Sequence, residues 1–283
     1  MSRKRLAVLG QPIGHSRSPA MHNAALAALG LAGEWLYEAM EVGPQEFESR
    51  VRAMPEEGFV GANVTVPHKR AALDLADEAS PTARAIGAAN TLIFAGGRIA
   101  AENTDATGFL EALPTGPAGQ RALVLGAGGS ARAVVWALVT GGAAVEIWNR
   151  THGRAEVLAA ELGASVAKPT RGASGDAAPL PLAVDRFDLI VNATTVGMGG
   201  AREGASSLKS LPVDADSMGE RHVLVDLAYG PDETELIRAA RAAGAAVVDG
   251  PEVLVRQGAA SLRIWTGENP PVEVMRRAAR ELR

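Results

Sequence analysis

A short apolar run that breaks into a glycine-rich segment constrains the fold of this chain more than any other feature. Residues 121–133 read Arg-Ala-Leu-Val-Leu-Gly-Ala-Gly-Gly-Ser-Ala-Arg-Ala, which predicts a strand, a tight loop and the start of a helix. Gly126 allows the sharp turn, Gly128 lets another group approach the backbone, and Ala131 permits close helix–strand packing. Since N–H groups at a helix start attract anions, this layout is typical of a dinucleotide pyrophosphate site. The candidate binding residues are Gly126, Ala127, Gly128, Gly129, Ser130 and Ala131.

A second predicted strand, residues 144–148, follows where a βαβ unit places the residue that reads the ribose. In an NAD site this strand usually ends in Asp or Glu, which accepts a hydrogen bond from the ribose 2′-OH. This chain has Asn149, Arg150 and Thr151 instead, with Arg154 one helical turn later. Two guanidiniums and a hydroxyl are able to bind a 2′-phosphate, and no carboxylate stands at the end of this strand to repel it. The sequence therefore favours NADP over NAD, and the intact layout disfavours a purely structural strand–turn–helix.

Composition excludes several other classes of protein. The 283 residues are enough for two domains, and a net charge of −4 without a lysine-rich run argues against nucleic-acid and membrane partners. The chain has no cysteine, which excludes disulfides, thiolate catalysis and cysteine-ligated zinc. Its five histidines form no His-Glu-x-x-His pair, so we expect no metal. The apolar run 6–9 is too short for a signal peptide or a membrane helix, so we expect a cytoplasmic protein.

The order of predicted elements indicates an α/β fold with two domains. Strands are predicted at 6–9, 35–42, 62–66, 91–94, 98–101, 121–125, 144–148, 187–191, 223–227 and 245–248, and helices at 20–29, 105–113 and 234–243. Gly96-Gly97 predicts a hairpin turn, and a breaker cluster at 114–117 marks a boundary. Long loops are expected at 168–181 and 199–216. We predict an N-terminal α/β substrate-binding and catalytic domain, 1–113, and a Rossmann-type NADP-binding domain, 114–251. Two C-terminal helices within 252–283 are expected to pack back on the first domain.

Polar segments in the first domain follow predicted strands, where ligand-binding loops of α/β domains gather. Ser16 and Ser18 precede a helix and are able to hold a carboxylate, although Ser18 before Pro19 is equally explained as an N-cap. Lys69 follows a strand; it is either a solvated cation or, in a cofactor cleft, a proton donor with a lowered pKa. Asp105 either caps a helix or pairs with Lys69 as its acid/base partner.

These segments, taken together and in chain order, resemble the shikimate dehydrogenase family. The resemblance is carried by Gly14-His15-Ser16-x-Ser18-Pro19 with His22-Asn23, Asn63-Val64-Thr65-x-Pro67-x-Lys69, Gly87-Ala88-Ala89-Asn90-Thr91, Asn103-Thr104-Asp105, Gly126-Ala127-Gly128-Gly129, Asn149-Arg150-Thr151, Asn192-Ala193-Thr194, and a helix with Gln257 before Trp265-Thr266-Gly267. It covers nearly the whole chain.

The resemblance implies NADPH-dependent, reversible reduction of 3-dehydroshikimate to shikimate, in the route to aromatic amino acids. It assigns Ser16 and Ser18 to the substrate carboxylate, with help from Tyr229. It assigns Thr65, Asn90 and Gln257 to the substrate hydroxyls, Lys69 and Asp105 to the reacting oxygen, and Thr194 and Gly250 to the cofactor. Lys69 is the expected proton donor in the reducing direction, and Asp105 orients it. The expected partners are small molecules, and the expected oligomeric state is a monomer or a homodimer.

Two alternatives remain open. One is an NAD-using quinate/shikimate dehydrogenase, which an acidic residue near Arg150 would have favoured over the observed Thr151 and Arg154. The other is an NADPH-sensing binding protein without catalysis, which would need neither Lys69 nor Asp105.

Overall fold

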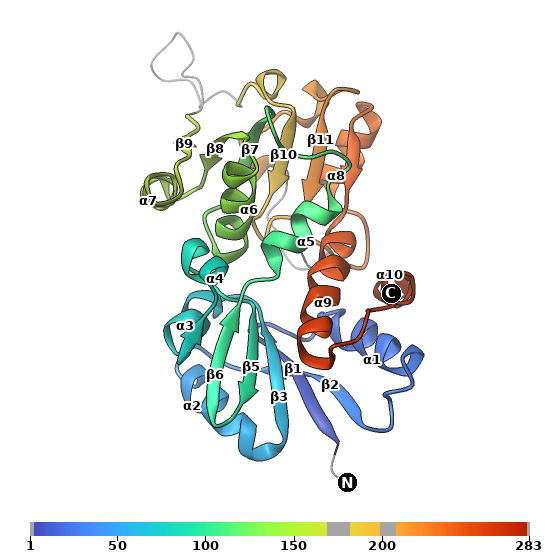
Figure 1. Ribbon diagram of the computed structural model, residues 1–283. Helices are drawn as coiled ribbons and strands as arrows, with labels where there is room; N and C mark the ends of the chain where they lie inside the picture. Colours follow the sequence, from blue (N-terminus) through green and yellow to red (C-terminus); the bar gives the residue numbers. More distant parts are fainter. Residues whose placement is uncertain (1–2, 169–181, 199–207, 282–283) are drawn as a thin grey trace. The chain divides into compact units, whose positions relative to one another are not determined.

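The computed structural model describes residues 3–168, 182–198 and 208–281 (Figure 1). The chain divides into two compact units: unit 1 comprises Met1–Ala112 and Pro251–Arg283, and unit 2 comprises Leu113–Gly250. Most of the predicted loops 168–181 and 199–216 lies outside the described residues; the described part of the second contains short 3₁₀ helices, Leu208–Ser210 and Ala215–Ser217. A search of the described residues finds no helix long and apolar enough to cross a membrane.

Unit 1 is built on a mixed sheet of six strands in the order β2-β1-β3-β5-β6-β4. The strands are β1 (Lys4–Gly10), β2 (Trp35–Glu41), β3 (Phe59–Val64), β4 (Glu78–Ala79), β5 (Thr91–Ala95) and β6 (Arg98–Glu102). β1 pairs in parallel with β2 and β3, whereas β5 pairs antiparallel with β3 and β6. Gly96 and Gly97, both with positive φ, make the two-residue turn of the predicted β5–β6 hairpin.

Helices cover both faces of this sheet. They are α1 (Ser18–Ala28), α2 (Phe47–Ala53), α3 (Lys69–Asp74), α4 (Pro81–Ile86), α5 (Asp105–Ala112), α9 (Gly250–Thr266) and α10 (Val272–Glu281), with a 3₁₀ turn at Met54–Glu57. Successive β1 side chains enter different cores, because side chains alternate along a strand: Leu6 and Val8 pack with α1, α9 and α10, while Ala7 and Leu9 pack with α2 and α3. The C-terminal helices therefore pack back on the N-terminal sheet, as expected, and Figure 1 shows α10 beside α1.

Unit 2 is an all-parallel sheet in the order β12-β11-β10-β7-β8-β9. Its elements are β7 (Arg121–Leu125), α6 (Gly129–Thr140), β8 (Ala144–Trp148), α7 (His152–Leu162), β9 (Ser165–Val166), a 3₁₀ turn at Val184–Arg186, β10 (Leu189–Asn192), β11 (Val223–Asp226), α8 (Glu235–Ala242) and β12 (Ala246–Val248). Counted along the chain within the unit, this is the 3-2-1-4-5-6 order of dinucleotide-binding folds. The predicted α/β class with a Rossmann-type domain is confirmed.

Two local predictions are wrong. Ser18 does not cap α1: it is the first residue of the helix, and Arg17 occupies the N-cap position without a capping hydrogen bond from its side chain. The strand predicted at 62–66 spans Phe59–Val64 instead, because Phe59 and Gly61 continue the ladder with β1. Beyond Val64, Pro67 has no backbone N–H with which to extend the sheet.

Candidate active site

Two charged side chains of unit 1 meet although they are 36 residues apart. Lys69 begins α3 and Asp105 begins α5. The Lys69 ammonium nitrogen lies 2.6 Å from Asp105 Oδ2, and their side chains are only 9% and 16% exposed. The Lys69 carbonyl also accepts a hydrogen bond from the Ala89 N–H at 2.8 Å, which fixes the start of α3. An ammonium so withdrawn from solvent and held by one carboxylate is well suited to exchange a proton with a bound oxygen.

The carboxylate of Asp105 is available for this pairing because Asn103 caps α5. Asn103 Oδ1 accepts hydrogen bonds from the backbone N–H groups of Asp105 and Ala106 at 3.1 and 3.3 Å. Its Nδ2 donates to the Ala88 carbonyl at 2.8 Å, so the cap is itself fixed. The alternative interpretation of Asp105 as merely an N-cap is therefore wrong.

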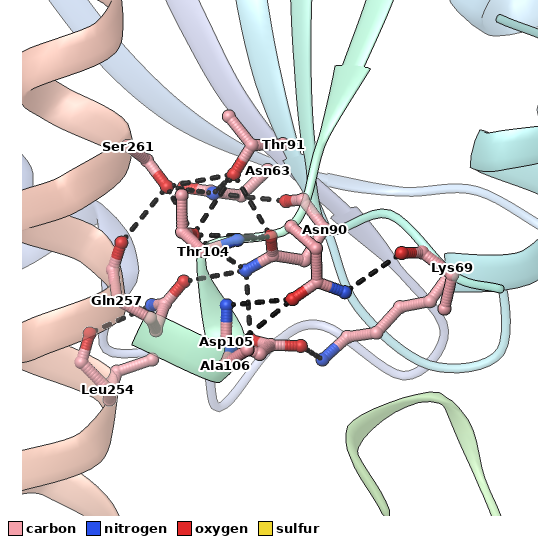
Figure 2. A network of polar contacts seen from close by, with 12 residues as sticks. Asn63, Lys69, Asn90, Thr91, Thr104, Asp105, Ala106, Leu254, Gln257 and Ser261 are labelled. Carbon is pink, nitrogen blue, oxygen red and sulfur yellow. Dashed lines mark hydrogen bonds and ion pairs between the residues drawn. The ribbon is translucent and has the colours of Figure 1, made fainter. Parts of the chain in front are cut away.

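Asn90 holds the second carboxylate oxygen. Its Nδ2 donates to Asp105 Oδ1 at 2.8 Å and lies 3.1 Å from Gln257 Oε1 (Figure 2). Its Oδ1 accepts the backbone N–H of Thr104 at 2.7 Å. Since a backbone N–H can only donate, this bond orients the Asn90 amide with its NH₂ group towards Asp105. Gln257 in turn donates from Nε2 to the Leu254 carbonyl at 2.8 Å.

The glycine loop of unit 2 has the geometry that a pyrophosphate site needs. Gly126 adopts a φ of +115°, and a Cβ there would lie 2.8 Å from the Ala193 carbonyl oxygen. Gly128 is the N-cap of α6; among the described residues no side-chain capping bond forms there, and a Cβ at Gly128 would meet no atom within 4 Å. The first glycine is thus required by the fold, whereas the second leaves open space before a helix start, where a phosphate group fits.

The segment after β8 also fits a phosphate. Asn149 Nδ2 donates to the Thr151 carbonyl at 2.9 Å, which shapes the turn, and Thr151 is the N-cap residue of α7. Arg150 and Arg154 are exposed, and neither forms an ion pair within the described part of the chain. Two unpaired guanidiniums beside a helix start are a strong anion site.

The other residues predicted for the cofactor lie at the carboxyl ends of strands. Thr194, after β10, donates from Oγ1 to Asn192 Oδ1 at 2.7 Å and accepts the Val196 N–H at 3.0 Å. Gly250 lies so close to the segment after β11 that a Cβ would be 2.9 Å from the Leu227 carbonyl oxygen.

Comparisons with known proteins agree with this geometry. Three family models match in chain order: the shikimate dehydrogenase substrate binding domain over residues 8–92, shikimate / quinate 5-dehydrogenase over 112–249, and the shikimate 5'-dehydrogenase C-terminal domain over 250–280. A protein of Methanopyrus kandleri named shikimate dehydrogenase (NADP(+)) is 45% identical over 279 residues, which is 97% of this chain and 94% of that protein. The chain belongs to the shikimate dehydrogenase family.

Solved structures of the family have the same fold. Shikimate 5-dehydrogenase from Thermus thermophilus, in complex with NADP(H) and shikimate, is 42% identical, with a TM-score of 0.82 and 99% of each chain covered. The ligand-free 5-ketofructose reductase of Gluconobacter sp. strain CHM43 is 30% identical, with a TM-score of 0.82 over 100% of this chain and 99% of that one. The fold therefore serves more than one ketone reductase, and side chains must decide the substrate.

The remaining residues that the family resemblance assigns to the substrate lie on separate elements. Ser16 and Ser18 lie at the start of α1, where Ser16 Oγ accepts the Ser18 N–H at 3.3 Å. Thr65 follows β3, and its N–H donates to the Leu9 carbonyl at 2.9 Å. Tyr229 belongs to unit 2 and follows β11.

Sequence reasoning missed the buried polar side chains that lie behind the Lys69–Asp105 pair. Ser261 Oγ, which is fully buried, lies 2.9 Å from Asn63 Nδ2, 2.9 Å from Thr91 Oγ1 and 3.0 Å from Thr104 Oγ1. A usable signal was present, because Ser261 lies four residues after Gln257, on the same face of a predicted helix. Asn63, Thr91 and Thr104 likewise stood within the quoted motifs without a role.

Proposed function

We propose that this chain is an NADP-dependent shikimate dehydrogenase that reversibly reduces 3-dehydroshikimate to shikimate. The observation that carries the proposal is the largely buried Lys69–Asp105 pair, 2.6 Å apart and oriented by Asn90, in a member of this family. The name of the Methanopyrus kandleri relative and the ligands of the Thermus thermophilus structure support the substrate and the cofactor.

Lys69 and Asp105 divide the proton chemistry. The Lys69 ammonium donates a proton to the oxygen of the carbonyl that is reduced, and water then returns a proton to the neutral amine. Asp105 accepts hydrogen bonds from Lys69 and Asn90 on its two oxygens, and its carboxylate holds the ammonium in place. In the oxidising direction the neutral amine accepts the hydroxyl proton. NADPH, when bound, supplies the hydride.

The substrate carboxylate is held by the hydroxyls of Ser16 and Ser18 at the start of α1, where a helix favours negative charge. Thr65, Asn90 and Gln257 bind the substrate hydroxyls. Gln257 Oε1 faces Asn90, so Gln257 offers the remaining N–H of its Nε2. Tyr229 as a further ligand of the carboxylate stays a prediction.

Unit 2 holds the cofactor. The loop Gly126 to Ala131 binds the pyrophosphate, because Gly128 leaves room before an uncapped helix start. Arg150 and Arg154, with Asn149 and Thr151, bind the 2′-phosphate, while Thr194 and Gly250 line the cofactor at strand ends. The cytoplasmic location and the monomeric or homodimeric state stay predictions.

A spectrophotometric assay of shikimate and quinate, each with NADP and with NAD, tests the proposal. We expect turnover of shikimate with NADP to exceed the other three combinations. Preferred turnover of quinate with NAD would favour the rival dehydrogenase. NADPH binding without turnover of either substrate would favour a sensor.

A further inference from the structure

Tyr37, in the edge strand β2, is held in place by ring stacking and by hydrogen bonds to its backbone. It is 1% exposed, and its ring stacks on His22 with centroids 4.0 Å apart and planes 7° from parallel. Asn23 bonds both backbone groups of Tyr37: Nδ2 donates to the carbonyl at 2.8 Å, and Oδ1 accepts the N–H at 2.9 Å. The His22-Asn23 pair, which stood in the sequence motifs without a role, thus fixes one tyrosine.

The Tyr37 hydroxyl donates a hydrogen bond to Asn63 Oδ1 at 2.7 Å. Asn63 Nδ2 donates to the Asn90 carbonyl at 3.1 Å and to Ser261 Oγ at 2.9 Å. Because a carbonyl can only accept, Asn63 must present its NH₂ to Asn90 and its oxygen to Tyr37. The amide cannot flip without placing two oxygens against each other.

Asn63 supports the residue that holds the catalytic carboxylate. Its bond to the Asn90 carbonyl fixes that backbone, and the Asn90 side chain donates to Asp105 Oδ1 at 2.8 Å (Figure 2). Ser261, a further side-chain partner of Asn63 from α9, lies 3.0 Å from Thr104 Oγ1, and the Thr104 N–H orients the Asn90 amide. A connected set of hydrogen bonds therefore runs from Tyr37 to the Lys69–Asp105 pair.

We propose that Tyr37 is a positioning residue for catalysis, which acts through Asn63 and Asn90 on the carboxylate of Asp105, with Ser261 as a further support of Asn63. The inference rests on the proposed function and deepens it. Removal of the phenol hydroxyl leaves Asn63 Oδ1 buried without its donor, and a network that loses one member relaxes as a whole. The resulting shift reaches Asp105, where small displacements lower the rate of the chemical step.

Tyr37→Phe tests the role directly, because it removes one oxygen and keeps the ring stacked on His22. We expect kcat with shikimate and NADP to fall about tenfold, with KM for both changing less than about twofold. Ser261→Ala, which removes the hydrogen bond between Ser261 Oγ and Asn63 Nδ2, should also lower kcat. Since both act through Asn63, the double variant should lose less than the product of the two single losses.

Trp265→Phe is the matched control. Trp265 belongs to the same aromatic cluster, with its ring centroid 6.3 Å from that of Tyr37, and its Nε1 donates to the Leu92 carbonyl at 3.0 Å. The substitution removes a partly buried hydrogen bond that does not involve Asn63 or Asn90. We expect it to lower the melting temperature and leave kcat within about twofold of wild type.

Three results would overturn the inference: an unchanged kcat in folded Tyr37→Phe, an equal loss of kcat in Trp265→Phe, or fully multiplicative losses in the double variant. Melting curves establish that each variant is folded at the assay temperature. Should Tyr37→Phe not fold, an unchanged kcat in Ser261→Ala would overturn it. A wild-type protein that turns over neither shikimate nor quinate would overturn the proposed function, and this inference with it.

Discussion

At the scale of single residues, Lys69 decides whether the proposed chemistry is right. Lys69→Ala should lower kcat by about 10²–10⁴-fold, which is the usual contribution of a positioned acid or base. We expect kcat and kcat/KM to fall in parallel, because the ammonium acts on the reacting oxygen and Ser16, Ser18 and unit 2 stay intact. Arg70→Ala, at the exposed neighbour in α3, is the control and should be nearly neutral. A Lys69→Ala enzyme with raised KM and near-normal kcat would make Lys69 a binding residue only.

A substitution at Arg150 tests how the proposed preference for NADP arises. The guanidinium is exposed after β8 and forms no ion pair within the described residues, so it is available to a 2′-phosphate. A charge-assisted hydrogen bond of this kind contributes about 1.5–3 kcal/mol, so Arg150→Ala should weaken NADP binding roughly ten- to a hundredfold. NAD, which lacks the phosphate, serves as the internal control and should bind almost as before. Equal weakening of both cofactors, measured by titration, would contradict the assignment.

The sequence predicted single chemical groups better than the bonds between them. Lys69 and Asp105 were recognisable because each follows a strand within a motif, and the structure brings them together. Ser261 was missed: its spacing from Gln257 indicates a shared helix face, but no local pattern identifies its partner Asn63, which lies 198 residues away. The choice between the two interpretations of Asp105 also required the structure, because only the hydrogen bonds to Asn103 show which side chain caps α5.

At the scale of elements, two positions of the loop before α6 are occupied by glycine for different physical reasons. Gly126→Ala should destabilise the protein, because φ is +115° and the new Cβ would lie 2.8 Å from a carbonyl oxygen. Gly128→Ala should leave the melting temperature nearly unchanged, because its Cβ would meet nothing within 4 Å, and yet weaken NADP binding by filling the approach to the helix start. Melting curves and NADP titrations of both variants check this contrast. Normal NADP affinity in Gly128→Ala would place the pyrophosphate elsewhere.

Helices with clear start and stop residues were predictable, and the shortest helices were not. α8 was expected at 234–243 and spans Glu235–Ala242, because Thr234 caps it and Gly244 ends it with a φ of +88°. α3 and α4, with six residues each, are too short to show a helical period, so only tertiary packing establishes them. α3 matters most, since its first residue is Lys69.

At the scale of the whole molecule, the return of α9 and α10 to unit 1 was predictable from strand order. Unit 2 already contains the six strands of a dinucleotide-binding sheet, so we expect the last helices to pack on another apolar surface. In the structure, Val255, Leu262 and Met275 of these helices share one hydrophobic cluster with Leu6 and Val8 of β1. The sequence did not predict the hydrogen bonds that α9 makes with the sheet of unit 1. Gln257 of this helix bonds Asn90, and Ser261 bonds Asn63.

Acid should destabilise the folded protein first through His22. Burial lowers the pKa of this imidazole from 6.5 to about 4, so the folded state favours the neutral ring. The unfolded chain takes up its proton near pH 6.5, and stability is therefore lost as pH falls from about 6.5 to about 4. Melting temperatures across this range should fall more steeply for wild type than for His22→Gln, which has no group to titrate there. Parallel curves would show that His22 does not contribute.

A second loss of stability should follow at lower pH, where Glu252 ties α9 to α10. Its carboxylate accepts hydrogen bonds from Arg276 at 2.6 Å and from Arg256 at 2.9 Å, and these, the Arg276 bond above all, lower the pKa of Glu252 from 4.5 to about 2. A carboxylate whose pKa is lower in the folded state stabilises that state above its unfolded pKa, and the contribution disappears as pH falls through the folded value. Glu252→Gln should therefore lower the melting temperature most above pH 4.5, and its difference from wild type should shrink towards pH 2. The melting temperature of both proteins, measured from pH 7 to pH 2, gives this difference directly. A difference that stays constant across the range would mean that Glu252 acts by shape and packing, and that its charge contributes nothing to the attachment of the C-terminal helix.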